Sequence, residues 1–157
     1  MQTTRFSYLG EQPQHIETIA RWHQSQWHHL SPQHSVESRV RLYSTYNNSP
    51  EVPFCLLATQ QGQPVGSASV VECDMETHSE LSPWLASVYV HPSFRQQGIA
   101  TELIRRCIEL ARQGSAERLY LFTPDQAAFY QERGWQPLAH CLYHNEPVDI
   151  LFYPLKP

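Results

Sequence analysis

The clearest hydrophobic pattern of the chain lies in its middle third. Residues 85–90 form a short run rich in β-branched and aromatic side chains, which is typical of a strand. Pro92 ends this run, because proline cannot donate a hydrogen bond to a strand ladder. From Ala100 to Ala111 apolar residues recur at helical spacing, and Gly114 follows as a stop signal. The pattern predicts a strand, a turn and an amphipathic helix, in this order.

The flanking regions carry the same kinds of pattern. Further strands are expected over residues 5–9, 54–59, 65–71, 118–123, 138–144 and 148–153. Further helices are expected to begin near Glu11, at the Ser35 cap and near Asp125, and Pro32 ends the first of them. Turn residues at 60–64 and 145–147 join strand pairs into hairpins. Because strands and helices are intermixed, the order predicts a mixed sheet flanked by helices.

Length and composition narrow the class of protein. The 157 residues suit one domain covering 1–157, and a net charge of −4 argues against a broad surface for nucleic acid. No apolar run is long enough for a bilayer, and the first residues lack a signal-peptide core, so we expect a cytoplasmic protein without a membrane partner. The four cysteines are far apart and are expected to be reduced.

The turn before the central helix has the features of an anion site. The first amides of a helix have no intrahelical acceptor, and the helix dipole adds positive potential at that end. A phosphate or pyrophosphate binds well there. Gly98 allows an anion to approach the backbone closely, and Arg95 adds a full charge with several donors.

Two motifs and their order carry a family resemblance. Arg95-Gln96-Gln97-Gly98-Ile99-Ala100 follows a strand and a His-Pro turn, and Phe129-Tyr130-Gln131-Glu132-Arg133-Gly134-Trp135 comes after the next strand. From residue 85 to 135 this arrangement resembles the GNAT (GCN5-related) N-acetyltransferases. The resemblance implies an α+β GNAT fold: a twisted, mostly antiparallel mixed sheet of about six to seven strands, flanked by about four helices.

The resemblance also implies acetyl-CoA as co-substrate and residues that hold it. The pyrophosphate would lie on Arg95, Gln96, Gln97, Gly98, Ile99, Ala100 and Thr101. The pantetheine arm would pair with the backbone of Val88, Tyr89 and Val90. Tyr130 would bind near the sulfur and protonate the departing thiolate. Thr123 stands where many relatives have an asparagine, so it would offer a hydroxyl in place of an amide.

The acceptor side is marked by acidic and aromatic residues. The central strand has no carboxylate, but acidic residues cluster just before it, and Glu72 is the candidate general base. Asp74 and Glu76 belong to the same loop and favour a cationic amine as acceptor. Trp27 and Trp84 are expected to contact this acceptor.

These residues predict an acetyl-CoA-dependent N-acetyltransferase. It would acetylate a primary amine, on a small molecule or a peptide N-terminus, directly in a ternary complex. The sequence leaves open whether the protein forms a homodimer. The alternative is a catalytically silent acyl-CoA-binding or sensing module. A plain nucleotide binder is disfavoured, since the loop lacks the Lys-Ser/Thr of a P-loop and the second glycine of a dinucleotide fingerprint. No metal is expected, because the histidines form no His-x-x-x-His turn beside a carboxylate.

Overall fold

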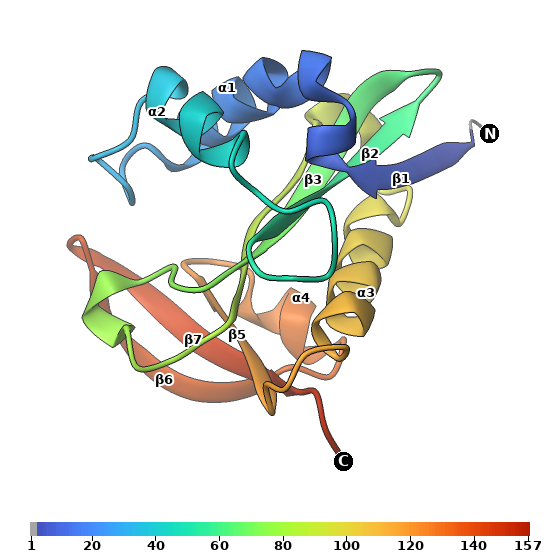
Figure 1. Cartoon of the computed structure of the whole chain (residues 1–157). Coiled ribbons are helices and arrows are strands. Elements are labelled where there is room, and N and C mark those ends of the chain that lie inside the picture. The colour runs from blue at the N-terminus through green and yellow to red at the C-terminus, as the bar shows by residue number, and fades with distance from the viewer. Residues whose placement is uncertain (1–2) are drawn as a thin grey trace.

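The architecture is a seven-stranded mixed sheet with helices on both faces, as the computed structural model of residues 3–157 shows (Figure 1). The strands are β1 (Thr4–Tyr8), β2 (Phe54–Gln60), β3 (Gln63–Val71), β4 (Trp84–Val90), β5 (Arg118–Thr123), β6 (Gln136–Tyr143) and β7 (Glu146–Pro154). Their order is β1-β2-β3-β4-β5-β7-β6, and among these neighbours the β4–β5 pair alone is parallel. This sheet confirms the predicted fold class.

Four α-helices and several 3-10 turns connect the strands within residues 3–157. The helices are α1 (Ile16–Trp27), α2 (Val36–Tyr43), α3 (Ile99–Ala111) and α4 (Ala127–Gln131), and the 3-10 turns are η1 (Leu9–Glu11), η2 (Pro13–His15), η3 (Glu76–His78) and η4 (Pro92–Phe94). The Ser35 cap is confirmed, since its hydroxyl accepts a hydrogen bond from the Ser38 amide.

Two helices are shorter than the sequence predicts, for local reasons. Gln12 is non-helical with φ −132° and ψ 65°, and Pro13–His15 form a 3-10 turn, so the first α-helix begins only at Ile16. Before α4, the Thr123 hydroxyl oxygen accepts hydrogen bonds from the amides of Asp125 and Gln126. This turn holds the chain out of the helix until Ala127.

Strand β2 separates two hydrophobic layers. Its residues alternate between the faces of the sheet, and every one of them is buried. Phe54, Leu56 and Ala58 pack in the cluster that contains the apolar face of α3. Cys55 and Leu57 pack on the other side with α1 and Tyr43 of α2. The helices therefore cover opposite faces of β2.

The middle of the sheet opens between β4 and β5. The two strands pair at Trp84 and Tyr120, near the start of β4, and diverge beyond that pair. Ser87 has φ 55°, and the β3–β4 register shifts at this point, which marks a bulge in β4. The carboxyl end of β4 is thereby separated from β5, and its backbone groups on that side are free to bind a ligand.

A polar cluster is buried between α1, α2 and β3. The His23 side chain is 0% exposed, and its two ring nitrogens are hydrogen-bonded to the Tyr43 hydroxyl and the Ser67 hydroxyl, each at 2.8 Å. Burial, with the nearby Arg39 charge, lowers the pKa of His23 to about 3. The imidazole is therefore neutral in the folded protein at pH 7.

Acid should destabilise the fold through His23. Its folded pKa lies below the ordinary value, so the unfolded chain binds more protons between about pH 6.5 and 3, and stability is lost as pH falls through that window. The expected slope from this one group is about 1.4 kcal/mol per pH unit. Denaturant unfolding of wild type and His23→Gln from pH 7 to 4 measures it; the variant should lose less stability with acid. His140→Gln, at an exposed histidine, is the control. Equal acid dependence in wild type and His23→Gln would refute the assignment.

Candidate active site

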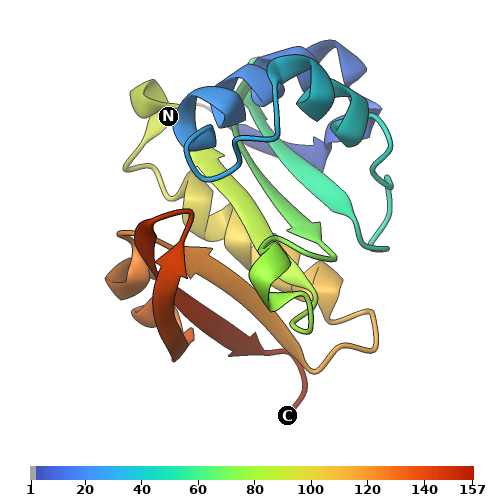
Figure 2. The ribbon, with the colours of Figure 1, turned by 90° about the vertical axis from the view of Figure 1, so that its left-hand side faces the viewer.

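One cavity of about 1140 Å³ runs through the opening between β4 and β5. At one end it is lined by the loop that leads into α3. The other end, which we call the acceptor end, is lined by the α1–α2 segment, the β3–β4 loop and the β6–β7 turn. Figure 2 is viewed toward this second end and shows the three segments, whose residues line the cavity. Ligands that enter from the two ends can meet in the middle, beside β4.

The loop before α3 forms a cradle for an anion. Gln96 and Gly98 have φ angles of 65° and 79°, so both residues adopt left-handed backbone conformations just before α3 begins at Ile99. A Cβ atom built on Gly98 would meet no atom within 4 Å, so the space beside this residue is open. Gln96, Gly98 and the first residues of α3 line the cavity, so this turn and the helix N-terminus suit a pyrophosphate.

Arg95 connects the cradle to β4. Its Nε donates a hydrogen bond to the Val90 carbonyl at 2.8 Å, and its guanidinium lies 5.8 Å from the centre of the Tyr89 ring. The bond fixes the arginine beside the cradle, and other N–H groups of its guanidinium remain available for an anion.

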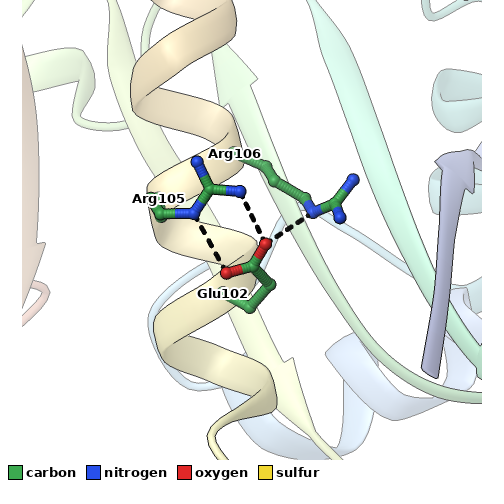
Figure 3. A network of polar contacts seen from close by, with 3 residues as sticks. All are labelled: Glu102, Arg105 and Arg106. Carbon is green, nitrogen blue, oxygen red and sulfur yellow. Dashed lines mark hydrogen bonds and ion pairs between the residues drawn. The ribbon is translucent and has the colours of Figure 1, made fainter. Parts of the chain in front are cut away.

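The first turn of α3 also carries an acidic residue whose charge is compensated. Glu102 accepts hydrogen bonds from Arg105 at 2.7 Å and from Arg106 at 2.9 Å, as Figure 3 shows. The Arg105 hydrogen bond, followed by that of Arg106, lowers the pKa of Glu102 to about 2. The two arginines balance the carboxylate, so the amino end of α3 keeps its positive potential.

The structure brings nearly all predicted cofactor residues to this cavity. The predicted residues on its wall are Val88, Tyr89, Val90, Arg95, Gln96, Gly98, Ile99, Ala100, Thr101, Thr123 and Tyr130. Gln97 is the exception, because it does not line the cavity, so its expected role is limited to its backbone amide. Its Oε1 accepts a hydrogen bond from Gln60 Nε2 at 3.0 Å, which turns the side chain toward β2 and away from the cavity.

Tyr130 reaches the cavity from α4. Its ring packs edge-on against Phe129 and Trp135, with centroid distances of 5.2 and 5.8 Å. Among residues 3–157, no hydrogen bond to its hydroxyl is found, although the side chain is only 9% exposed. Burial raises the pKa of this phenol, so it remains protonated at pH 7 and can donate its proton.

The acceptor end contains Trp27 but not Trp84. Trp27 lines the cavity wall at the end of α1. Trp84 is 0% exposed, and its Nε1 donates to the Leu81 carbonyl at 2.6 Å. Its side chain packs in a hydrophobic cluster with Met75 and Ile150, beneath the acceptor loops. The prediction that Trp84 contacts the acceptor is therefore wrong, and the residue belongs to the hydrophobic core.

The three predicted carboxylates of the β3–β4 loop all line the cavity, in different surroundings. Glu72 is exposed and accepts a hydrogen bond from the Ser82 hydroxyl at 3.2 Å. Glu76 accepts hydrogen bonds from the Tyr143 hydroxyl and pairs with His144 Nε2 at 3.0 Å, and the Tyr143 bond chiefly lowers its pKa.

Asp74 differs from its two neighbours. It lies half-buried on the wall, and no hydrogen bond or ion pair to its carboxylate is found among residues 3–157. Burial raises the pKa of this carboxyl to about 7, against the opposing effect of Arg39. Asp74 can therefore exchange a proton near neutral pH.

Several residues of the acceptor end escaped the sequence analysis. They come from two segments that are distant in the chain, residues 39–46 and 143–146: Arg39, Tyr43, Tyr46, Tyr143 and Glu146. No spacing connects them, and Arg39 and Tyr43 simply appear as positions of a short helix. The structure alone brings them together.

The described residues contain neither a metal-binding cluster nor a membrane-spanning helix. Within residues 3–157, no three His, Cys, Asp or Glu side chains are grouped so that they could hold a metal ion. In the same part of the chain, none of the helices has the length and apolar character that a membrane crossing requires.

Comparison with solved structures identifies the same fold elsewhere. The yncA protein of Salmonella typhimurium, solved with its cofactor acetyl-CoA, superposes with a TM-score of 0.72 at 16% identity, over 98% of this chain and 94% of the other. An aminoglycoside 6'-acetyltransferase type Ii gives a TM-score of 0.74 at 18% identity, over 99% and 98% of the two chains. An N-acetyltransferase from Staphylococcus aureus Mu50 gives 0.74 at 13% identity, over 98% and 99%.

Sequence comparison gives the family. An amino-acid acetyltransferase of Edwardsiella ictaluri is 37% identical over 54 residues, which cover 34% of this chain and only 12% of that protein. The sequence model of the acetyltransferase (GNAT) family matches residues 16–135, which include the cradle, β4 and Tyr130. The chain therefore belongs to the GNAT family of acetyl-CoA-dependent acetyltransferases.

Proposed function

We propose that the protein acetylates a primary amine, on a small molecule or a peptide N-terminus, within a ternary complex. The observation that carries this proposal is the single cavity that joins the anion cradle to the acidic acceptor end. Acetyl-CoA supplies an acetyl group activated as a thioester. The cavity allows the amine to approach that group directly, so no covalent intermediate with the protein is needed.

The residues of the cradle and β4 would hold the co-substrate. The amides from Gln96 to Ala100 and the Arg95 guanidinium suit a pyrophosphate. The unpaired backbone beside Val88 suits the amides of a pantetheine arm, and an amide there can stabilise charge on the thioester oxygen. Thr123 accepts two amide hydrogen bonds, and its own O–H remains able to donate.

Two side chains would move protons. We assign the general base to Asp74, because its carboxylate lines the cavity, lacks a partner among the described residues and titrates near pH 7. Glu72 remains the second candidate, although it is more exposed and is hydrogen-bonded to Ser82. At the other side of the reaction, the Tyr130 hydroxyl would protonate the departing thiolate.

Thiol release separates this enzyme from a silent acyl-CoA-binding module. The protein is incubated with acetyl-CoA and a panel of amines, and free CoA and acetylated product are measured. An enzyme releases CoA in proportion to product. Tight acetyl-CoA binding with no CoA release for any amine class would instead support the silent module.

Substitutions in the cradle should weaken acetyl-CoA binding. In Gly98→Val the side chain enters the open space beside the cradle, and φ 79° is strained for a β-branched residue, so both effects oppose binding. Arg95→Ala removes a charge, and its effect should be larger at low salt. We expect Kd to rise about 10-fold or more in each variant, as for a lost charge-assisted hydrogen bond. Calorimetry measures it, with Arg5→Ala as the control; unchanged Kd in both folded variants would contradict the cradle assignment.

A further inference from the structure

Arg39 is a buried cation on the wall of the acceptor end. Its side chain projects from α2, is 5% exposed and lines the cavity. Its Nε donates to Gln24 Oε1 at 2.9 Å, Nη2 to the Ser31 hydroxyl at 2.7 Å and Nη1 to the Tyr43 hydroxyl at 3.4 Å. All three partners are neutral, so they fix the guanidinium without compensating its charge.

Arg39 has no paired carboxylate in the part of the chain that the structure describes. Within residues 3–157, no carboxylate forms an ion pair with Arg39 at 4.0 Å or less, although five carboxylates line the same cavity. Three of these five are bound to other groups, Glu72 to Ser82, Glu76 to Tyr143 and Glu146 to His29. A buried cation without a paired anion is costly, and a guanidinium has more N–H donors than the three used here.

The surroundings of Arg39 determine which charge a ligand needs. His23 on α1 is neutral, Tyr43 on α2 is a protonated phenol, and His34 in the connecting segment has its pKa lowered by burial and by Arg39. From the β3–β4 loop, Asp74 is the acidic group that acts on Arg39 electrostatically, from beyond ion-pair distance. The acceptor end therefore offers one fixed positive group, Arg39, and one carboxylate, Asp74, that no described side chain binds.

We propose that Arg39 binds the carboxylate of the acceptor, and that the acceptor is an amino acid whose ammonium group lies on the side of Asp74. This inference rests on the proposed acetyl transfer and names its substrate class. A guanidinium presents a planar set of donors that matches a carboxylate, which favours this group over a neutral one. An amine without a carboxylate would leave the Arg39 charge buried and unpaired.

The test compares acceptors that differ in one charge. The twenty L-amino acids and their carboxamides are assayed for CoA release by wild type, Arg39→Gln, Arg39→Lys and Arg41→Gln. Arg41 is an exposed residue of the same helix and does not line the cavity, so it controls for removal of a charge from α2. Thermal unfolding and acetyl-CoA binding of each variant show whether its fold is kept.

We expect wild type to acetylate at least one amino acid with kcat/KM about 10-fold or more above its carboxamide, as for one charge-assisted contact. Arg39→Gln should abolish this preference mainly by raising KM for the amino acid, while kcat/KM for the carboxamide changes little. Arg39→Lys should recover part of the preference, since lysine keeps the positive charge but lacks the planar pair of donors that a guanidinium offers to a carboxylate. Arg41→Gln should behave as wild type.

Other outcomes would overturn the inference. The inference is refuted if wild type acetylates the carboxamide as efficiently as the amino acid, or acetylates only amines that have no carboxylate. This comparison uses the wild-type protein alone, so it does not depend on the folding of any variant. If Arg39→Gln lowers kcat/KM equally for the amino acid and its carboxamide, Arg39 only stabilises the α1–α2 segment and does not bind the acceptor. In these cases acetyl transfer itself is retained. Absence of CoA release with every amine tested would instead refute the proposed function, and the inference with it.

Discussion

Asp74→Asn should lower kcat/KM for the amine at pH 7 by about 10²-fold or more, the usual range for loss of a general base. An ammonium acceptor must lose a proton before its nitrogen can attack, and the Asp74 carboxylate on the cavity wall is placed to take it. Asparagine has nearly the same shape but cannot accept the proton. Steady-state kinetics with saturating acetyl-CoA measure the loss.

The pH profile makes this prediction specific. Burial raises the pKa of Asp74 to about 7, so the base is protonated and inactive below that pH and ionised above it. Wild-type kcat/KM should therefore rise with pH through about 7 and level off, apart from titration of the amine itself. Asp74→Asn should lack the step at 7 and keep only the titration of the amine.

Two neighbouring carboxylates control for local charge. Glu80 is exposed in the same loop and does not line the cavity, so Glu80→Gln should keep wild-type kinetics. Glu72→Gln tests the second candidate base. If Glu72→Gln removes the step near pH 7 and Asp74→Asn retains it, the base is Glu72 and Asp74 only shapes the acceptor end.

The cofactor side of the protein could be predicted because its information is local. A strand, the Arg95–Ala100 loop and an amphipathic helix follow one another in the chain, and each is recognisable from consecutive residues. The backbone conformation of a short loop of this kind is determined by its own glycine and by the helix that follows. The direction of the Gln97 side chain could not be predicted, because it depends on Gln60, which is distant in the sequence.

The acceptor side could be predicted only in part, since three separate segments form it. The acidic loop was recognisable as a cluster, but the difference between Asp74 and Glu76 comes from Tyr143 and His144 in another hairpin. The charge of Arg39 could be read from the sequence, but its burial could not. Trp84 was misassigned because a tryptophan beside a binding region has no sequence signal that distinguishes core from wall.

Tyr130→Phe should lower kcat by about 10²-fold, the low end of the general-acid range, because a CoA thiolate is a fairly good leaving group. The ring and its contacts with Phe129 and Trp135 remain. The hydroxyl has no hydrogen bond to the residues 3–157, so its removal should leave the unfolding temperature and acetyl-CoA binding nearly unchanged. Only the proton for the departing thiolate is lost.

The kinetic pattern distinguishes a proton donor from a packing residue. Because the lost interaction acts in the transition state, kcat should fall while KM for the amine changes little. Tyr153→Phe is the matched control, since Tyr153 also packs against Trp135 and does not line the cavity. If kcat is unchanged in Tyr130→Phe, water or another group, and not Tyr130, protonates the departing thiolate. A large fall in unfolding temperature would instead show that the hydroxyl supports the fold, and the role of Tyr130 in proton transfer would be rejected.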